Sequence, residues 1–140
     1  MKDYILPEAA ERWFAETIGD LFSLTAKQGY DSEQVVKTML TVGLWPKMLL
    51  SEHLHFYCTG LLYTLDYFVK DGNIIKGNHY DSYVMWMYGY MLKWWMYKYP
   101  EDLSFVSKCF PISKFDGGFG CYHSQGWNYL VDLAHSFVTG

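Results

Sequence analysis

The sequence predicts an all-α protein, a compact bundle of five to seven helices formed by residues 1–140 as a single domain. Three observations support this fold class. Apolar residues recur at spacings of three and four along most of the chain, which is the period of an amphipathic helix. Residues that favour helix ends, such as Gly29, Asp31 and Asp81, border these segments. The 140 residues are 51% hydrophobic and 19% charged, which is enough apolar material for a folded core.

The chain is expected to begin with two helices. The first covers residues 7–28, and Gly29 follows it as a C-cap. The second covers residues 32–42. Its N-cap is Asp31, and Gln34 three residues later completes a capping box.

A third helix is expected from Pro46 to about Lys70, with Gly60 as a point where it can break. The following stretch, "GNIIKGNHYD", contains two glycines and two asparagines and is expected to form a loop over residues 72–81. This loop is the one plausible linker in the chain. It would join two halves, residues 1–71 and 82–140.

The second half is also expected to hold three helices, over residues 82–99, 101–108 and 124–138. The first of them contains "YVMWMYGYMLKWWMY", which is apolar on nearly every side. Such a helix must be central in the fold or covered by a partner. Residues 109–122 contain a proline and three glycines and are expected to be irregular.

The two halves resemble each other faintly. A shift of the chain by 66 residues aligns four pairs of positions: Gly60 with Gly126, Tyr63 with Tyr129, Leu65 with Val131, and Asp66 with Asp132. Each half also places a long helix and a short helix before this segment. The sequence therefore predicts two similar three-helix halves that share one interface.

Charge and hydropathy argue against two classes of partner. The formal net charge is -4 and Arg12 is the sole arginine, whereas phosphate binding favours a basic, arginine-rich face. The most apolar stretch, residues 83–97, is too short to span a membrane and contains Lys93. Neither nucleic acid nor a membrane is therefore expected as a partner.

The three cysteines, Cys58, Cys109 and Cys121, share no short repeated spacing. An odd number of cysteines without such spacing is not typical of a disulfide framework. A reducing compartment is the simpler interpretation. We therefore expect a cytoplasmic protein.

The segment "CYHSQGW", residues 121–127, allows three interpretations. Ser124 can cap the last helix, so that His123 and Gln125 near the cap bind a partner. Cys121 and His123 could instead form a nucleophile–base pair beside a helix N-terminus. A zinc site could use Cys109, Cys121, His123 and His135, with His53 and His55 as another conceivable half-site, but the usual paired spacings are missing. The first interpretation is preferred, with no cofactor and no metal expected.

Trp86 and Trp94 are the other candidate binding residues. Aromatic residues make up 20% of the chain. A domain of this size buries only about two-thirds of its surface, so some rings must lie near the surface. Because both tryptophans fall away from the helix face traced by Tyr88 and Leu92, we expect them at a homodimer or partner contact. They also offer a stacking platform for a planar ligand.

The start of the last helix carries "HSQG", residues 123–126, followed by "YLVD", residues 129–132. This pattern resembles a family of short uncharacterised domains, seen mostly in Firmicutes, with a Leu-His-Thr-Gln-Gly motif before a Tyr-Ile-Val-Glu helix. The likeness covers residues 101–138 and, more faintly, 33–69, where Tyr57 stands in place of the histidine. The resemblance implies a shared fold and a regulatory role, and it implies no reaction.

These observations favour a small non-catalytic binding or regulatory protein, of bacterial or phage origin, that acts by protein–protein contact. A phage inhibitor of a host defence system and an antitoxin-like partner both fit its size, acidity and aromatic content. Two alternatives stay open. One is a small enzyme that uses Cys121 and His123, and the other is a binder of a small planar ligand such as a nucleotide.

Overall fold

The computed structural model describes residues 8–50, 60–103, 105–118 and 126–139, and it confirms the predicted all-α fold class. Apart from an isolated antiparallel bridge between Tyr30 and Lys76, these residues form no β-structure. The elements follow in the order α1 (Glu8–Lys27), α2 (Ser32–Thr41), α3 (Trp45–Leu50), α4 (Leu61–Gly72), α5 (Ser82–Lys98), the 3-10 helix η2 (Pro100–Asp102), α6 (Val106–Cys109), α7 (Ile112–Gly117) and α9 (Trp127–Thr139).

Two long helices, α1 and α5, form the centre of the fold and run antiparallel. Tyr97 near the end of α5 donates its hydroxyl hydrogen to the carbonyl of Glu11 near the start of α1. Trp86 near the start of α5 bonds to Asp20 in the second half of α1. The helices approach closely at Gly89, where a Cβ atom would lie 2.9 Å from a ring carbon of α1. A larger residue there would push the two helices apart.

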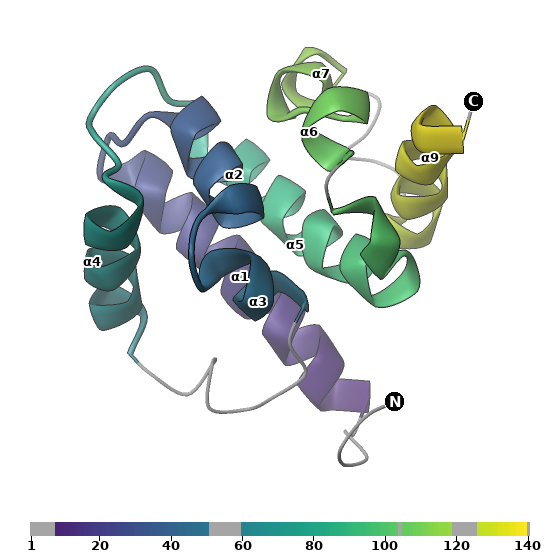
Figure 1. Ribbon diagram of the computed structural model, residues 1–140, viewed down its shortest axis with the longest axis horizontal. Helices are drawn as coiled ribbons and strands as arrows, with labels where there is room; N and C mark the ends of the chain where they lie inside the picture. The colour runs from purple at the N-terminus through teal and green to yellow at the C-terminus, as the bar shows by residue number, and fades with distance from the viewer. Residues whose placement is uncertain (1–7, 51–59, 104, 119–125, 140) are drawn as a thin grey trace.

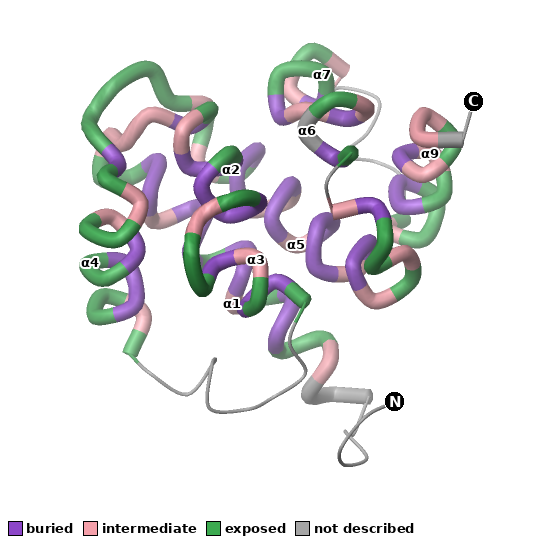
Figure 2. The backbone as a smooth tube through the Cα atoms, in the orientation of Figure 1, coloured by how far each residue is buried: buried purple, intermediate pink, exposed green. Residues whose placement is uncertain are grey.

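The other helices surround this central pair (Figure 1). α4 packs on α1 at one side of the molecule, and α9 packs on α5 at the other side. The buried face of α4 is turned toward the middle of the molecule (Figure 2). The elements η2 and α7 contact α5, and α6 contacts α9.

Helix α5 is buried on most of its sides, so it is the central helix that its apolar sequence predicts. Its Tyr88 and Trp95 are fully buried, and so is Lys93. The Nζ of Lys93 donates to the carbonyl of Leu49 at 2.7 Å and lies 4.7 Å from the centre of the Tyr97 ring. These contacts stand in for water around the buried ammonium group.

The loop predicted over residues 72–81 is held against the start of α2. Asp31 caps α2 as predicted, because its Oδ1 accepts from the backbone N–H of Gln34 at 3.0 Å. The side chain of Gln34 does not complete the predicted capping box. It accepts from the backbone N–H of Ile75 at 2.9 Å and donates to the carbonyl of Asn73 at 3.1 Å. The loop is therefore bonded to the first half and is not a loose linker.

The helix predicted from Pro46 to about Lys70, with a possible break at Gly60, corresponds to two described helices, α3 and α4. α3 ends at Leu50, and α4 begins after Gly60, which has extended backbone with a ψ of 143°. Residues 51–59 lie outside the described residues. The non-helical backbone of Gly60 directly before α4 agrees with the break that the sequence allows at this glycine.

The region after α5 is more helical than the sequence predicts. The helix expected over residues 101–108 is divided into η2 and α6. Residues 109–122 were expected to be irregular, and this is wrong for α7. Ile112 and Phe115 lie one turn apart on α7 and are both buried. Burial of these two side chains outweighs the loop-forming proline and glycines around them.

Helices α4 and α9, which the 66-residue shift relates, hold comparable places on α1 and α5. Both begin directly after an exposed glycine. The carbonyl of this glycine accepts a hydrogen bond from the backbone N–H four residues later, which is that of Thr64 in α4 and of Leu130 in α9. Their buried positions also correspond: Thr64, Leu65 and Phe68 on α4, with Leu130, Val131 and Ala134 on α9. Duplication of the chain stays a prediction, with which this arrangement agrees.

Candidate binding surface

Three of the predicted site residues, Cys121, His123 and Gln125, lie outside the described residues. Their roles as a catalytic pair or as binding residues stay predictions. The first residue of α9 beyond that segment, Trp127, is half-buried.

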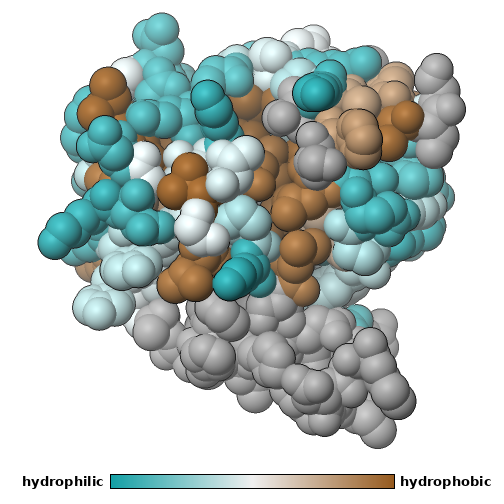
Figure 3. All heavy atoms as spheres, in the orientation of Figure 1, coloured by the Kyte–Doolittle hydropathy of each residue, from teal (hydrophilic) through white to brown (hydrophobic). Residues whose placement is uncertain are grey.

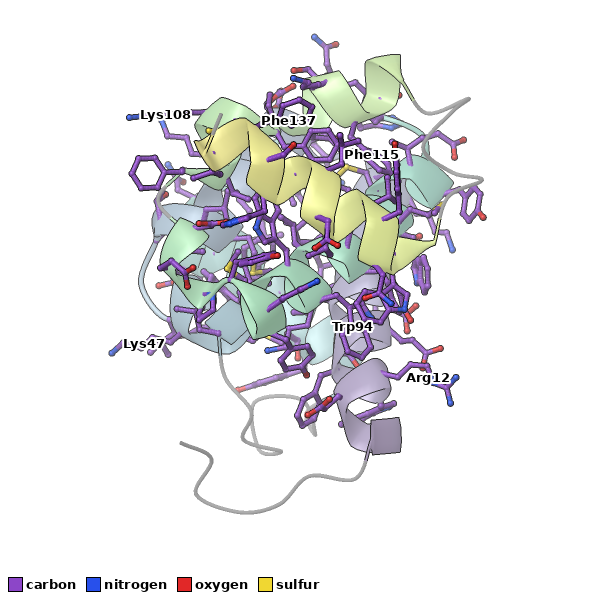
Figure 4. All side chains as sticks on the ribbon, turned by 90° about the vertical axis from the view of Figure 1, so that its right-hand side faces the viewer. Arg12, Lys47, Trp94, Lys108, Phe115 and Phe137 are labelled. Carbon is purple, nitrogen blue, oxygen red and sulfur yellow. The ribbon has the colours of Figure 1, made fainter. Side chains whose placement is uncertain are left out.

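Trp86 and Trp94 belong to a row of aromatic rings along one face of α5. Trp86 stacks on Tyr90 at 5.0 Å between ring centres, and Tyr90 meets the edge of Trp94 at 6.3 Å. Trp94 stacks on Trp127 of α9 at 4.3 Å, near the start of that helix (Figure 4). All these rings are half-buried. The row therefore serves packing inside the molecule, and a homodimer built on it stays a prediction.

The most exposed apolar helix face belongs to α4. Leu62, Tyr63 and Tyr67 have exposed fractions of 66%, 70% and 46%. They lie opposite the buried Leu65 and Phe68, because residues on a helix are about 100° apart. We call the outward residues of this helix the α4 face: Leu62, Tyr63, Asp66, Tyr67 and Lys70.

Tyr67 rests on a buried indole. Its ring centre lies 5.8 Å from that of Trp45 on α3, and Trp45 meets Phe68 edge-on at 4.4 Å. The indole N–H of Trp45 is buried and has no hydrogen-bond partner among the residues described here. This contact restricts the Tyr67 ring, and a side chain that is already restricted loses less conformational freedom on binding.

A buried carboxylate joins η2 to α9. The Oδ2 of Asp102 accepts from Trp95 Nε1 at 2.9 Å and from His135 Nδ1 at 2.6 Å. Because the carboxylate accepts, the hydrogen of the imidazole sits on Nδ1. The imidazole also stacks on the ring of Tyr99 at 3.6 Å, with 2° between the planes.

The same network continues to the surface of α9. The Oδ1 of Asp132 accepts from Lys98 Nζ at 2.7 Å and from the hydroxyl of Tyr99 at 3.1 Å. The bond from Lys98 lowers the pKa of Asp132, and the same bond raises the pKa of Lys98. An aspartate–histidine pair can orient a catalytic base. Here the bonds of Asp102 and Asp132 also join the end of α5 and η2 to α9, which is a structural role.

Two adjoining hollows lie between α1 and α5. One, of about 460 Å³, is lined by the end of α1 and by His79, Tyr80, Asp81 and Ser82. The other, of about 400 Å³, is lined by Ser23, Lys27, Ser82, Tyr83 and Trp86. They share Lys27 and Ser82. Trp86, a predicted ligand-stacking residue, therefore lines a hollow, although its Nε1 is bonded to Asp20 at 2.8 Å.

A third hollow, of about 490 Å³, lies between α2 and α7, with Val36 and Ile112 in its lining. Apolar side chains also gather along the middle of the face seen in Figure 3, between the side of α2 and α3 and the side of α6. Val36 and Ile112 are themselves buried, whereas the other residues that line this hollow are half-buried or exposed.

Two kinds of site are not found in the part of the chain that the structure describes. No cluster of three or more histidine, cysteine, aspartate or glutamate residues could hold a metal ion there. No described helix is both long and apolar enough to cross a bilayer.

Comparison of the chain with family models, with curated proteins and with solved structures gave no match. The resemblance of residues 101–138 to the Firmicutes family therefore stays a prediction.

Sequence reasoning missed the α4 face and the Asp102–His135 pair. The signal for the first is present in "LLYTLDYF", residues 61–68, because Tyr63 and Tyr67 fall outside the stripe that the buried residues trace. The pair has no local signal, since 33 residues separate its members.

Proposed function

We propose that this chain is a small binding or regulatory protein that acts by protein–protein contact, with the α4 face as its contact surface. The observation that carries the proposal is the exposure of Leu62, Tyr63 and Tyr67 on one side of a single helix. Scattered exposed apolar residues are ordinary on protein surfaces, whereas a contiguous group of them marks an interaction site.

The chemistry of the face suits protein recognition. Tyrosine contributes a large contact area with few rotatable bonds and is enriched at interfaces. Tyr67 is already positioned by Trp45. Asp66 and Lys70 are exposed between the apolar residues and add charges that can select a partner. Such a face supports binding without any chemical step, as in inhibitors or antitoxin-like partners.

A site-specific photocrosslink tests the proposal. p-Benzoylphenylalanine is placed at Tyr63 and, in a second variant, at Tyr129, and cells that express each variant are irradiated. The two positions match well, because both are exposed tyrosines that follow a glycine at the start of a helix. We expect a covalent protein adduct from position 63 and none from position 129.

Adducts at position 129 alone, or at neither position while both variants stay folded, would contradict the proposal. A melting curve of each purified variant provides the folding check.

A second candidate function, binding of a small planar ligand, is favoured by one observation. Trp86 and Tyr83 line the same hollow as Lys27, which could meet an anionic group. Fluorescence titration with a nucleoside monophosphate tests this candidate. Quenching that disappears in a Trp86→Phe variant would support it, and quenching that the variant retains would count against it.

A further inference from the structure

The charges on the α4 face are arranged in a self-complementary way. Asp66 and Lys70 lie one turn apart on the exposed side of the helix, with Tyr63 and Tyr67 at the same side. Tyr63, Asp66 and Lys70 fall within about 60° of one another around the helix axis. Neither charged residue makes an ion pair with any residue that the structure describes. The face therefore carries one acidic and one basic side chain, Asp66 and Lys70, among its apolar residues.

An antiparallel copy of the same helix matches this arrangement. When two α4 helices cross antiparallel with their two-fold axis between Asp66 and Lys70, the acid of each copy faces the base of the other. Two ion pairs then form from one pair of residues, as a two-fold interface requires. In the same register, Tyr67 lies close to the axis, so the two Tyr67 rings approach the centre of the contact.

We propose that the occupant of the α4 face is a second copy of this chain, and that the two copies form an antiparallel α4–α4 dimer with reciprocal Asp66–Lys70 pairs. This inference rests on the proposed function, because it names the partner of the same surface. Charge complementarity favours a second copy over a foreign protein. The acid and the base of one helix match the base and the acid of an antiparallel copy, so a single face supplies both halves of each ion pair.

The size of the interface sets the expected strength. α4 has 12 residues and is therefore about 18 Å long. A contact built mainly on one such helix falls at the small end of specific interfaces. We expect a dimer with a dissociation constant of roughly 1–100 µM, which sedimentation equilibrium resolves directly.

Charge reversal tests the proposed register. In Asp66→Lys, both ion pairs become contacts between like charges, and the same holds for Lys70→Asp. Each single variant should raise the dissociation constant at least about tenfold. An equimolar mixture of the two variants should associate again, because each copy supplies the charge that the other needs. The double variant D66K/K70D should also restore the homodimer.

Matched controls carry the same change in net charge elsewhere. Glu16→Lys on α1 and Lys108→Asp on α6 alter exposed side chains, and Lys108 points away from the body of the protein (Figure 4). Both controls should leave the dissociation constant unchanged within about twofold. Thermal melting of every variant at low concentration verifies that the monomer is folded.

Three results would overturn the inference: a wild-type chain that stays monomeric up to about 500 µM, a dimer indifferent to both reversals, or a mixture of D66K and K70D that fails to associate. The crosslink at position 63 separates this failure from failure of the proposed function. An adduct with another protein refutes the α4–α4 dimer and supports the proposed function, whereas an adduct of twice the chain mass supports both.

Discussion

Helices α4 and α9 show how two elements with the same packing pattern differ in use. Both follow a glycine, both bury the same series of positions, and both pack on one member of the central helix pair. On α9, the polar residues Asp132 and His135 are bonded to the end of α5 and to η2. On α4, the positions that correspond to them hold Asp66 and Val69.

Part of the difference lies in residue 69, which is valine where α9 has His135, and part lies in the segment that runs beside each helix. α5 continues directly into η2, which brings Lys98, Tyr99 and Asp102 to the side of α9. Asp66 of α4 forms no ion pair with a described residue, and it stays exposed between two tyrosines. Helix α9 is therefore held by a polar network, whereas the outward side of α4 is the surface that we propose for a partner.

Among the substitutions considered, removal of the buried Asp102 carboxylate should weaken the contact between α9 and the rest of the fold most. In Asp102→Ala, Trp95 and His135 lose their shared acceptor in a buried setting. We expect the free energy of unfolding to fall by about 3–5 kcal/mol, measured by urea denaturation. The control Glu101→Ala changes an exposed residue of the same 3-10 helix and should cost less than about 0.5 kcal/mol. Equal losses of unfolding free energy in the two variants would show that the hydrogen bonds of Asp102 do not stabilise the fold.

A substitution that makes α9 more like α4 should cost less. His135→Val introduces the residue that α4 carries at the corresponding position, Val69. Asp102 keeps its bond from Trp95 and loses the one from the imidazole. We expect a loss of about 1–3 kcal/mol in urea denaturation. If His135→Val were as damaging as Asp102→Ala, the bond from His135 and not the bond from Trp95 would account for the contribution of Asp102.

A third exchange concerns the first residue of each helix. Trp127→Leu places the α4 residue, Leu61, at the start of α9 and removes the stack on Trp94. A stacked aromatic pair contributes about 0.5–1.5 kcal/mol beyond its buried area, so we expect a loss of that order. Tryptophan fluorescence during unfolding measures it. A loss as large as that of Asp102→Ala would mean that Trp127 anchors the helix in the core.

The smallest expected effect is the response of α9 to acid. The bond from Lys98 lowers the pKa of Asp132, so the folded state holds the ionised carboxylate more strongly than the unfolded state does. The stability that this provides is present above the ordinary carboxyl pKa of about 4 and is lost as the pH falls through the lowered pKa. Melting temperatures between about pH 6 and pH 2 should therefore fall slightly more for wild type than for Asp132→Asn. Parallel curves for the two proteins would contradict this.

The sequence predicts most of the fold because helix ends and apolar periods are local signals. Asp31 caps α2 and Gly60 directly precedes the first residue of α4, both as the residues indicate. α7 escaped prediction because two buried side chains, Ile112 and Phe115, decide it through tertiary contacts.

The sites were harder to predict for the same reason. Trp86 and Trp94 were correctly placed away from the innermost face of α5, but their neighbours on α1 and α9 could not be read from the sequence. The Asp102–His135 pair likewise joins distant segments.

The most direct test of the account compares the exposed tyrosines of the two helices. The chain is labelled with 3-fluorotyrosine, the signals of Tyr63, Tyr67 and Tyr129 are assigned with Tyr→Phe variants, and fluorine spectra are recorded over a dilution series. The account predicts that the signals of Tyr63 and Tyr67 shift with concentration while that of Tyr129 stays in place. A shift of the Tyr129 signal, with those of Tyr63 and Tyr67 unchanged, would contradict it.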